Sequence, residues 1–342
     1  MGSMARHGVG SWLNRSLLAA TLWLAAFSAF AGALEIKSLA LTVSDLDRSV
    51  TFYEKALNFR KVSERVLVGR DYDYLTGVYG SRVKSATLQL GDETIELDQY
   101  LSPAGNPIPT DSRSNDAWFQ HFAVVVSDMD RAYEHLKGTP FQAISSAPQT
   151  IPASNAAAAG VKAFKFKDPD GHPLELLYFP ADKGRAKWHR PDGRLFLGID
   201  HSAITVGDTE RSAAFYRDLL GLTIGGGSLN TGSTQEQLDN AFGAVVRVTG
   251  LRPARAEGPG LEFLQYLTPS GGRPALPGAR VNDLTHIRVV LEVDDIDRLA
   301  KALMERGAGF ISPRVLAVAG IPYAKSLLVK DPDGHAVMLV QH

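Results

Sequence analysis

Histidine and glutamate residues stand at corresponding places of a repeated sequence. The stretch FKDPDGHPLELLYF contains Glu175, and VKDPDGHAVMLVQH contains Met338 at the same place. Two further stretches of similar pattern begin at His121 and His286. Imidazole and carboxylate groups on neighbouring, inward-facing strands can bind a borderline or hard divalent ion and leave positions open for water or substrate. We therefore ask which elements could bring these residues together.

The repeat covers most of the chain and indicates a duplication. LALTVSDLDRSVTFYEKALNF begins at Leu39 and SAITVGDTERSAAFYRDLLGL at Ser202, a separation of 163 residues that the two DPDGH stretches share. IELDQYLSPAGNP at Ile95 matches LEFLQYLTPSGGRP at Leu261. The polar stretch ADKGRAKWHRPDGRL between the copies is typical of a linker. The sequence predicts two domains with a linker between them: residues 34–180, 181–195 and 196–342.

Each copy is itself double, because an apolar, β-branched run leads into a capped helix four times. Ser44-Asp-Leu-Asp47 and Ser127-Asp-Met-Asp130 have the capping-box form, and Asp208 and Asp294 are the other N-cap candidates. Apolar segments broken by Gly and turn residues follow each helix and predict three strands, with DPDG as a hairpin turn. The expected fold is α+β, with four βαβββ modules near residues 35–101, 117–180, 196–268 and 284–342.

Helical spacing also predicts the inward face of the first helix. The apolar residues that recur on this face are Leu46, Val50, Tyr53 and Leu57.

This arrangement resembles the vicinal oxygen chelate superfamily, which includes glyoxalase I, bleomycin-resistance proteins and extradiol dioxygenases. The motifs that carry the resemblance are the helix entry VSDLDRSVTFYEKAL and the closing hairpin DPDGHPLELL, repeated in order at a constant offset. The resemblance implies that modules pair into cupped β-sheets, each around a cleft. It also implies that any metal ligands come from the first and last strands of each module.

Carried over one place at a time, the resemblance assigns two positions to each module. In chain order these positions hold Ser38 and Glu96, His121 and Glu175, His201 and Glu262, and His286 and Met338. Serine is a poor ligand for a borderline or hard ion, and methionine is a soft one. Two of the positions are therefore compromised.

Two pairings of the modules are open. If neighbouring modules share a cleft, as in extradiol dioxygenases, Ser38 damages one cleft and Met338 the other. If the second module pairs with the third, as in fused two-unit glyoxalase I proteins, both defects fall in one cleft. The other cleft is then complete, and we favour this crossed arrangement. It predicts one divalent ion (Zn, Ni, Mn or Fe) with the ligands His121, Glu175, His201 and Glu262.

The resemblance also implies a chemistry for such an ion. The expected function is that of a glyoxalase-like metalloenzyme, of isomerase or lyase type, acting on a small substrate with vicinal oxygens, with Glu175 or Glu262 as general base. One alternative is an extradiol-type ring-cleaving dioxygenase, which Met338 disfavours. Another is a metal-free ligand-binding protein of the bleomycin-resistance kind.

The N-terminus predicts export. Met1-Gly2-Ser3 before a second Met is typical of a tag remnant, and a basic start, an apolar run from Leu17 to Phe30 and Ala31-Gly32-Ala33 are typical of a signal peptide. The run is shorter than the ~20 apolar residues that a spanning helix needs. We therefore expect residues 1–33 to be removed, with no stable membrane anchor afterwards, and a periplasmic or secreted protein.

Composition limits the partners. The formal net charge is −1, with 44% hydrophobic and 21% charged residues, which is typical of a soluble globular protein. The sequence has no basic stripe that would indicate a nucleic-acid partner. There is no cysteine, so neither a disulfide nor a cysteine nucleophile can form. We expect a monomer or homodimer that binds a small molecule.

Three further features have a structural and a functional interpretation. His172 and His335, inside the DPDGH stretches, are interpreted as turn residues rather than ligands. The R-x-N-D motifs at 113–116 and 280–283 could cap Asx-turns or clamp an anionic substrate. ASNAAAAG at 153–160 is typical of a flap over a cleft.

Overall fold

The structure, a computed structural model, describes residues 32–255 and 257–342 as four modules of similar element order. The first module contains β1 (Ala33–Thr42), α1 (Leu46–Leu57), β2 (Arg60–Val68), α2 (Arg70–Thr76), β3 (Arg82–Leu90) and β4 (Glu93–Ser102). The second contains β5 (Gln120–Val126), α3 (Met129–Lys137), β6 (Gln142–Ala143), β7 (Gln149–Thr150), β8 (Lys162–Lys167) and β9 (Pro173–Tyr178). The predicted tag remnant and signal peptide lie outside the described residues, apart from Gly32 and Ala33.

A short 3-10 helix, η1 (Ala186–His189), lies between the second and third modules. The third contains β10 (Phe196–Thr205), α4 (Thr209–Tyr216), β11 (Thr223–Asn230), α5 (Gly232–Asp239), β12 (Val245–Arg252) and β13 (Gly260–Thr268). The fourth contains β14 (Ile287–Val293), α6 (Ile296–Glu305), β15 (Gly309–Phe310), β16 (Lys325–Lys330) and β17 (Ala336–Gln341). The α+β class and the four βαβββ modules are confirmed, and the first and third modules add a short helix after their second strand.

Aspartate residues cap the helix that follows the first strand of each module. The N-caps are Asp45, Asp128, Asp208 and Asp295, and each side chain accepts a hydrogen bond from the backbone N–H three residues later. The predicted serine-led caps and the predicted cap at Asp294 are wrong by one residue, because the carboxylate that can reach this N–H lies one position further on. The predicted inward face of α1 is confirmed, since all four of its apolar residues are buried: Leu46, Val50, Tyr53 and Leu57.

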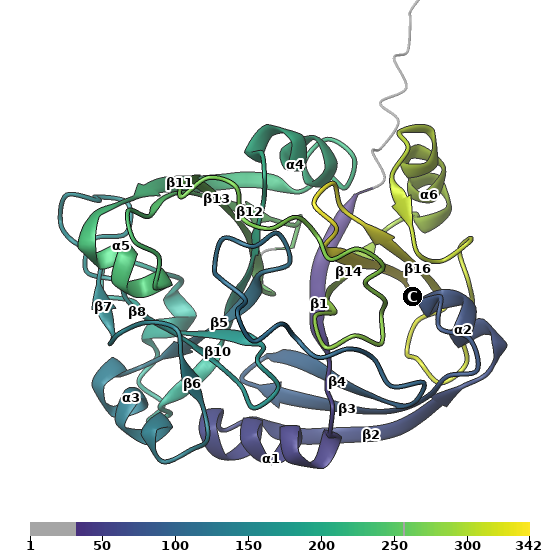
Figure 1. Cartoon of the computed structure of the whole chain (residues 1–342), viewed down its shortest axis with the longest axis horizontal. Helices are drawn as coiled ribbons and strands as arrows, with labels where there is room; N and C mark the ends of the chain where they lie inside the picture. Colours follow the sequence, from purple (N-terminus) through teal and green to yellow (C-terminus); the bar gives the residue numbers. More distant parts are fainter. Residues whose placement is uncertain (1–31, 256) are drawn as a thin grey trace, which may run out of the picture. The chain divides into compact units, whose positions relative to one another are not determined.

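The modules pair across the duplication. An 8-stranded sheet with the order β15-β16-β17-β14-β1-β4-β3-β2 combines the fourth and first modules, whereas a 9-stranded sheet with the order β11-β12-β13-β10-β5-β9-β8-β6 combines the third and second (Figure 1). β7 pairs with β8 beside this path. The seams between modules are antiparallel, β1 with β14 and β10 with β5. Pairing of neighbouring modules is therefore wrong, and each sheet takes one module from each copy.

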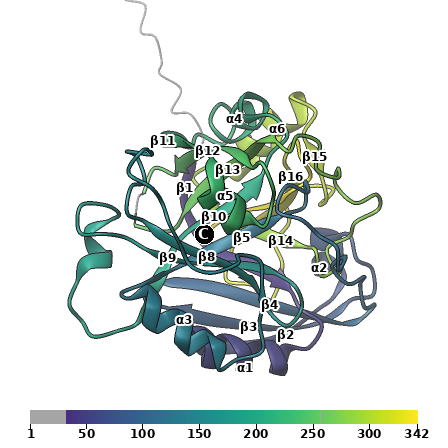
Figure 2. The same ribbon diagram turned by 60° about the vertical axis from the view of Figure 1, so that its left-hand side comes forward.

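One apolar core joins all four modules. Its members include Leu39, Phe122, Phe263 and Leu339, one from each module and all buried. Figures 1 and 2 show α1 and α3, which come from different sheets, together at one end of the described fold, and α4 and α6 at the other end. Because a buried large apolar side chain contributes about 1.5–3 kcal/mol, this shared core holds the two sheets together.

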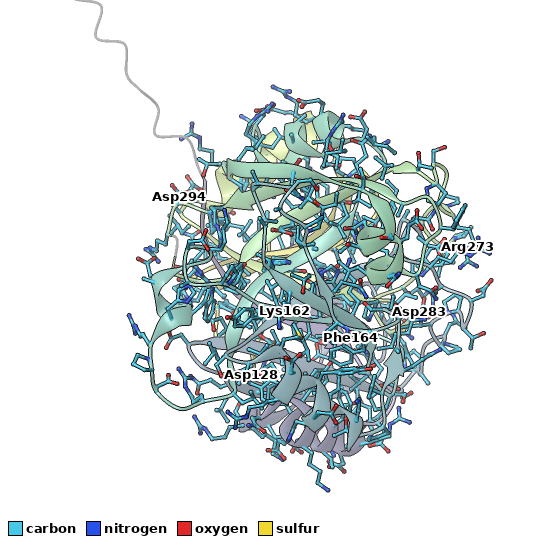
Figure 3. All side chains as sticks on the ribbon, turned by 90° about the vertical axis from the view of Figure 1, so that its left-hand side faces the viewer. Asp128, Lys162, Phe164, Arg273, Asp283 and Asp294 are labelled. Carbon is cyan, nitrogen blue, oxygen red and sulfur yellow. The ribbon has the colours of Figure 1, made fainter. Side chains whose placement is uncertain are left out.

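The two loops that carry the chain between the sheets are fixed by a repeated aspartate. Asp116 accepts hydrogen bonds from the backbone N–H of Arg113 and from the backbone N–H and guanidinium of Arg273. Asp283 accepts hydrogen bonds from the backbone and side chain of Asn106, and from the backbone N–H three residues before it. Figure 3 shows Arg273 and Asp283 on the same side of the fold. Both aspartates of the R-x-N-D motifs therefore hold local turns, but they do so through the N–H three residues before them and not through the N–H two residues later that an Asx-turn uses.

Glycine allows these loops to cross closely. A Cβ at Gly105 would lie 1.9 Å from the carbonyl oxygen of Asn282, and a Cβ at Gly272 would lie 1.6 Å from that of Asn115. No side chain fits at such distances, so both crossings depend on glycine.

Each DPDGH hairpin reaches from its own sheet to the other. In the turn between β8 and β9, His172 Nδ1 lies 2.9 Å from Asp168 Oδ2, and its Nε2 lies 3.0 Å from the carbonyl oxygen of Thr42 at the end of β1. In the turn between β16 and β17, His335 Nε2 lies 2.8 Å from the carbonyl oxygen of Thr205 at the end of β10. Both histidines are structural turn residues, as predicted.

The second aspartate of each DPDG turn holds the start of a helix from a module of the other sheet. Asp170 accepts hydrogen bonds from the backbone N–H of Ser44 at 3.0 Å and from its hydroxyl at 2.6 Å, and pairs with Arg48 of α1. Asp333 pairs in the same way with Arg211 of α4. The two sheets are therefore joined by reciprocal, repeated contacts.

These contacts predict a pH-dependent stability. Burial lowers the pKa of His172, but the charge and hydrogen bond of Asp168 raise it further, so the net pKa lies above its ordinary value. A raised histidine pKa contributes stability that is complete below the unfolded pKa of about 6.5 and is lost as the pH rises through the folded pKa. His172→Ala should lower the free energy of unfolding by about 2–4 kcal/mol, because a buried hydrogen-bonded group is removed.

Urea denaturation at about pH 6 and about pH 9 measures this contribution. The unmodified protein should lose more stability between the two pH values than His172→Ala does. An equal loss in both proteins would contradict the stabilising role of His172.

Candidate metal centre

Four central strands of the 9-stranded sheet bring the four predicted ligands together. β10 carries His201, β5 carries His121, β9 carries Glu175 and β13 carries Glu262, and these strands lie side by side in the order β13-β10-β5-β9. The antiparallel register of β10 and β5 makes the two histidines diagonal neighbours, with ring centroids 6.0 Å apart. The two glutamates come from the strands on either side.

Glu175 lies between the histidines. Its Oε2 is 3.3 Å from His121 Nε2 and 3.8 Å from His201 Nε2. One ligand atom from each of these three residues lies within 4.8 Å of the others. Glu262 is at the edge of the group, with Oε2 3.4 Å from His201 Nε2. The donor atoms therefore converge as a metal centre requires.

Burial and mutual contact shift the charges of these groups. Burial raises the pKa of Glu175, but its hydrogen bond and charge interaction with His121, together with other nearby cations, lower it to about 2. Burial lowers the pKa of His201, but Glu262 and other carboxylates raise it to about 9. Burial also lowers the pKa of His121 and raises that of Glu262. Because an imidazole must be neutral to bind an ion, metal binding at this centre should release a proton from His201.

Asp200 orients His201. Its Oδ2 lies 3.1 Å from His201 Nδ1, and its Oδ1 accepts a hydrogen bond of 2.8 Å from Trp188 Nε1 and lies 3.4 Å from Arg185 Nε. The Nδ1–H therefore donates to the carboxylate, and Nε2 faces the two glutamates. A carboxylate in this position fixes the ring and the tautomer of a metal-binding histidine. Trp188 and Arg185 lie in the predicted linker, which thus supports the site.

The ligand set opens into a cleft of about 410 Å³. Its wall is partly apolar, with Ile151, Val161, Leu177, Leu238 and Leu264. Residues of the predicted flap, Ala157 and Ala158, also line it. In the same segment, Asn155 Nδ2 donates a hydrogen bond of 2.7 Å to Asn230 Oδ1 on β11, which belongs to the other module of the sheet. The segment therefore joins the two modules beside the cleft.

The corresponding positions of the 8-stranded sheet contain an arginine where we predicted a histidine. His121 pairs with Ala203, and the equivalent Ala40 pairs with Arg288. The prediction of His286 at this position is therefore wrong by two residues. His286 precedes β14 and lines a separate cavity of about 190 Å³. Counting back from the helix caps would have found the arginine, because the N-cap of each following helix lies seven residues after His121 and after Arg288.

Guanidinium groups fill this second cleft. Arg288 Nη2 lies 2.7 Å from Asp98 Oδ2 and 3.9 Å from Glu96 Oε2, and Arg65 Nη2 lies 3.1 Å from the same Glu96 oxygen. Ser38 donates a hydrogen bond of 3.1 Å to the other oxygen of Glu96. The remaining cavity, which Met338 also lines, measures about 10 Å³, too small for an ion with a substrate. Ser38 and Met338 thus share one cleft, as the crossed pairing predicts.

Lys165, which we did not predict from the sequence, is a buried charged residue in the cleft of the 9-stranded sheet, here called the first cleft. It is 3% exposed and pairs across the strands with Glu175. Its Nζ lies 2.6 Å from Asp239 Oδ1, and Asp239 Oδ2 accepts hydrogen bonds from Gln235 at 2.6 Å and from the hydroxyl of Tyr266 at 2.7 Å. Burial lowers the pKa of Lys165, but Asp239 and Glu175 raise it above its ordinary value. The available signal is a lysine that alternates with phenylalanines in AFKFK, residues 163–167.

Comparison with known proteins gives the family. The model of the Glyoxalase/Bleomycin resistance protein/Dioxygenase superfamily matches residues 35–176 and again 198–339. The chain belongs to this superfamily.

The individual proteins that resemble this chain have low sequence identity to it. A 2-epi-5-epi-valiolone epimerase from Actinomyces sp is 28% identical over 173 residues, which cover 47% of this chain and 91% of that protein. Glyoxalase I from Zea mays has a similar fold, with a TM-score of 0.58, 18% identity and coverage of 91% of this chain and 93% of that chain. A mutant of the same enzyme gives a TM-score of 0.60, again at 18% identity, with 91% and 94% covered.

In the part of the chain from residue 32 onward, no helix is long and apolar enough to cross a membrane.

The geometry predicts which substitutions remove a metal ion. His121→Ala or His201→Ala should abolish most of the affinity for a divalent ion, because each deletes a donor atom. Asp200→Asn should cost about 10–100-fold, as expected for a group that only orients a ligand. Ser38→Ala and His286→Ala are controls and should leave the affinity unchanged.

Equilibrium dialysis followed by elemental analysis measures both affinity and stoichiometry. We expect about one ion per chain, because one cleft retains its four ligands. A stoichiometry near two, or loss of the ion in His286→Ala, would contradict the assignment.

Proposed function

We propose that this protein is a metal-dependent enzyme that moves a proton beside a carbonyl group of a small substrate with vicinal oxygens, a reaction of isomerase or lyase type. The observation that carries the proposal is the convergence of two imidazoles and two carboxylates on a cleft of about 410 Å³. The superfamily and its epimerase and glyoxalase relatives support an enzyme of this kind.

The residues present fit a divalent ion. The donor set of His121, Glu175, His201 and Glu262 suits Zn, Ni, Mn or Fe, and leaves positions open for two substrate oxygens. Asp200 holds Nε2 of His201 toward the other donors. When bound, the ion supplies Lewis acidity, which withdraws electrons from the substrate oxygens and acidifies the neighbouring C–H.

Glu262 is the better-placed glutamate for proton transfer. Its side chain is 30% exposed, whereas that of Glu175 is 7% exposed and contacts both histidines. A carboxylate that faces the cleft can take a proton from the substrate carbon and return it there or at the neighbouring carbon. Glu175 has a structural role, because its position between the two histidines holds the ligand set together.

This assignment predicts the effect of a conservative substitution. Glu262→Gln should slow proton exchange by about 10²–10⁴-fold, as expected for loss of a general base, while the protein still takes up metal. Exchange of C–H for deuterium in small α-hydroxyketones, followed by NMR in D₂O, measures the step. Glu96→Gln, at the same place in the second cleft, should not affect it. Normal exchange in Glu262→Gln would show that Glu262 is not the base.

One observation favours a second candidate. The group His121, Glu175 and His201 is a two-histidine, one-carboxylate set, which is typical of non-haem iron oxygenases. A dioxygenase of this kind would consume O₂ with a catechol when loaded with Fe(II), and Glu262→Gln would leave that activity intact. Absence of any bound metal in protein purified without chelator would instead favour a ligand-binding protein.

We also propose that the protein is exported and that its leader is removed. The support is the basic and apolar pattern of the N-terminus. Ala33 is buried as the first residue of β1, and its N–H donates to the carbonyl oxygen of Leu220. A cut after Ala31 would keep this contact, and Ala29-Phe30-Ala31 has the same A-x-A form as the predicted Ala31-Gly32-Ala33.

Intact-mass measurement of protein released by osmotic shock tests export. We expect a mature chain that begins near residue 32, or near residue 34 if the cut follows Ala33. Full-length protein retained in the membrane fraction would reject the proposal.

A further inference from the structure

The ammonium group of Lys165 has hydrogen-bonding capacity that its partner does not use. An ammonium carries three N–H donors. Among the described residues, its one hydrogen bond is the contact with Asp239, and Lys165 lines the same cleft as the metal ligands. Asp239 is held in turn by Gln235 and Tyr266, so the ammonium is fixed in place beside the ligand set.

The 8-stranded sheet shows that the fold does not need this charged pair. At its second cleft, Leu328 pairs with Met338 as Lys165 pairs with Glu175. Thr76 is the last residue of α2, as Asp239 is the last residue of α5. Burial of an ion pair is costly, and the same backbone forms with leucine and threonine instead. The pair is thus present in the cleft that keeps its metal ligands and absent from the cleft that lost them.

Charges around the first cleft leave room for a negative ligand. The charged side chains that line it are the cations Lys165, Lys183, Arg185 and Arg252 and the carboxylates Glu175, Asp200 and Glu262. Asp239 pairs with Lys165, and Asp182 lies 4.0 Å from Lys183, so two further carboxylates face these cations. With a divalent ion, the four cations and the ion would carry one positive charge more than the five carboxylates neutralise. A ligand with a negative group would offset it.

We propose that Lys165 is a second ligand-binding group of the cleft and that its ammonium group binds a carboxylate or phosphate group of the substrate. The vicinal oxygens of the same substrate would bind the metal ion. The proposal rests on the proposed function and specifies its substrate class: small anionic molecules in which a charged arm accompanies two neighbouring oxygens. Asp239 is a positioning residue, because it acts by holding the ammonium toward the cleft.

Matched hydroxamates test this directly, because a hydroxamate presents two vicinal oxygens to a metal. Acetohydroxamate has no charged arm, succinohydroxamate adds a carboxylate and phosphoglycolohydroxamate adds a phosphate. Their dissociation constants would be measured by calorimetry on the metal-loaded protein. We expect at least one charged probe to bind about 10–100-fold tighter than acetohydroxamate, as for a hydrogen bond to a charged group. The preferred arm then identifies the substrate group.

The variant Lys165→Leu/Asp239→Thr installs the leucine and threonine found at the equivalent places of the 8-stranded sheet, so neither member of the pair is left as an unpaired buried charge. It should abolish the advantage of the charged probes and leave acetohydroxamate binding unchanged. Lys162→Met is the matched control, since side chains alternate between the faces of β8, and Ala163 and Lys165 line the cleft whereas Lys162 does not. It should behave as the unmodified protein.

No gain from either arm, or a gain that survives in the double variant, would overturn the role of Lys165 and leave the metal centre intact. Failure of acetohydroxamate itself to bind would overturn the proposed metal-dependent function, and the inference with it.

Discussion

Backbone pairing between β5 and β10 is the constraint on which the rest of the site depends. These strands come from different copies of the duplication, and their register places His121 and His201 as diagonal neighbours on one face. Each then has a parallel neighbour, β9 or β13, that supplies a glutamate. Neither copy alone contains the ligand set. The reciprocal contacts of His172 and His335 support this arrangement, because they join each hairpin to the sheet of the other seam.

The β5–β10 and β1–β14 seams have the same strand pairing but different side chains. At the β5–β10 seam, carboxylates and imidazoles contact one another and line an open cleft. At the β1–β14 seam, the guanidinium of Arg288 lies between Asp98 and Glu96, and little space remains. The differences form a consistent set, since Ser38, Arg288 and Met338 stand where the other sheet has three of the predicted ligands, and Leu328 stands where it has the buried lysine. The 9-stranded sheet therefore keeps an open cleft with the predicted ligands, while the 8-stranded sheet has internal ion pairs at the equivalent place.

Much of this was predictable from the sequence. The constant offset between the copies gave the number and order of the modules, and the resemblance to the superfamily supplied the four residues that we predict as ligands. Pairing of the modules was harder, because the local pattern of each strand is the same whether it pairs with a neighbour or across the duplication. Only the combination of Ser38 and Met338 in one cleft favoured the crossed arrangement, which the strand order confirms.

Other features could not be found from sequence similarity between the copies. His286 resembles His121, because each precedes an apolar run. Successive side chains of a strand point to opposite faces, however, so the register of the strand decides which residue faces the cleft. Lys165 looks like an ordinary strand residue until Asp239, far along the chain, appears beside it. The support of His201 by Trp188 through Asp200 likewise depends on how the linker folds back.

We propose that one metal ion binds at the seam between the second and third modules. Anomalous X-ray scattering from crystals of metal-loaded protein, recorded on both sides of the absorption edge of the metal, would locate this ion. We expect a single anomalous peak between His121, His201, Glu175 and Glu262. A peak beside Glu96 or His286, or no peak at the β5–β10 seam, would contradict it.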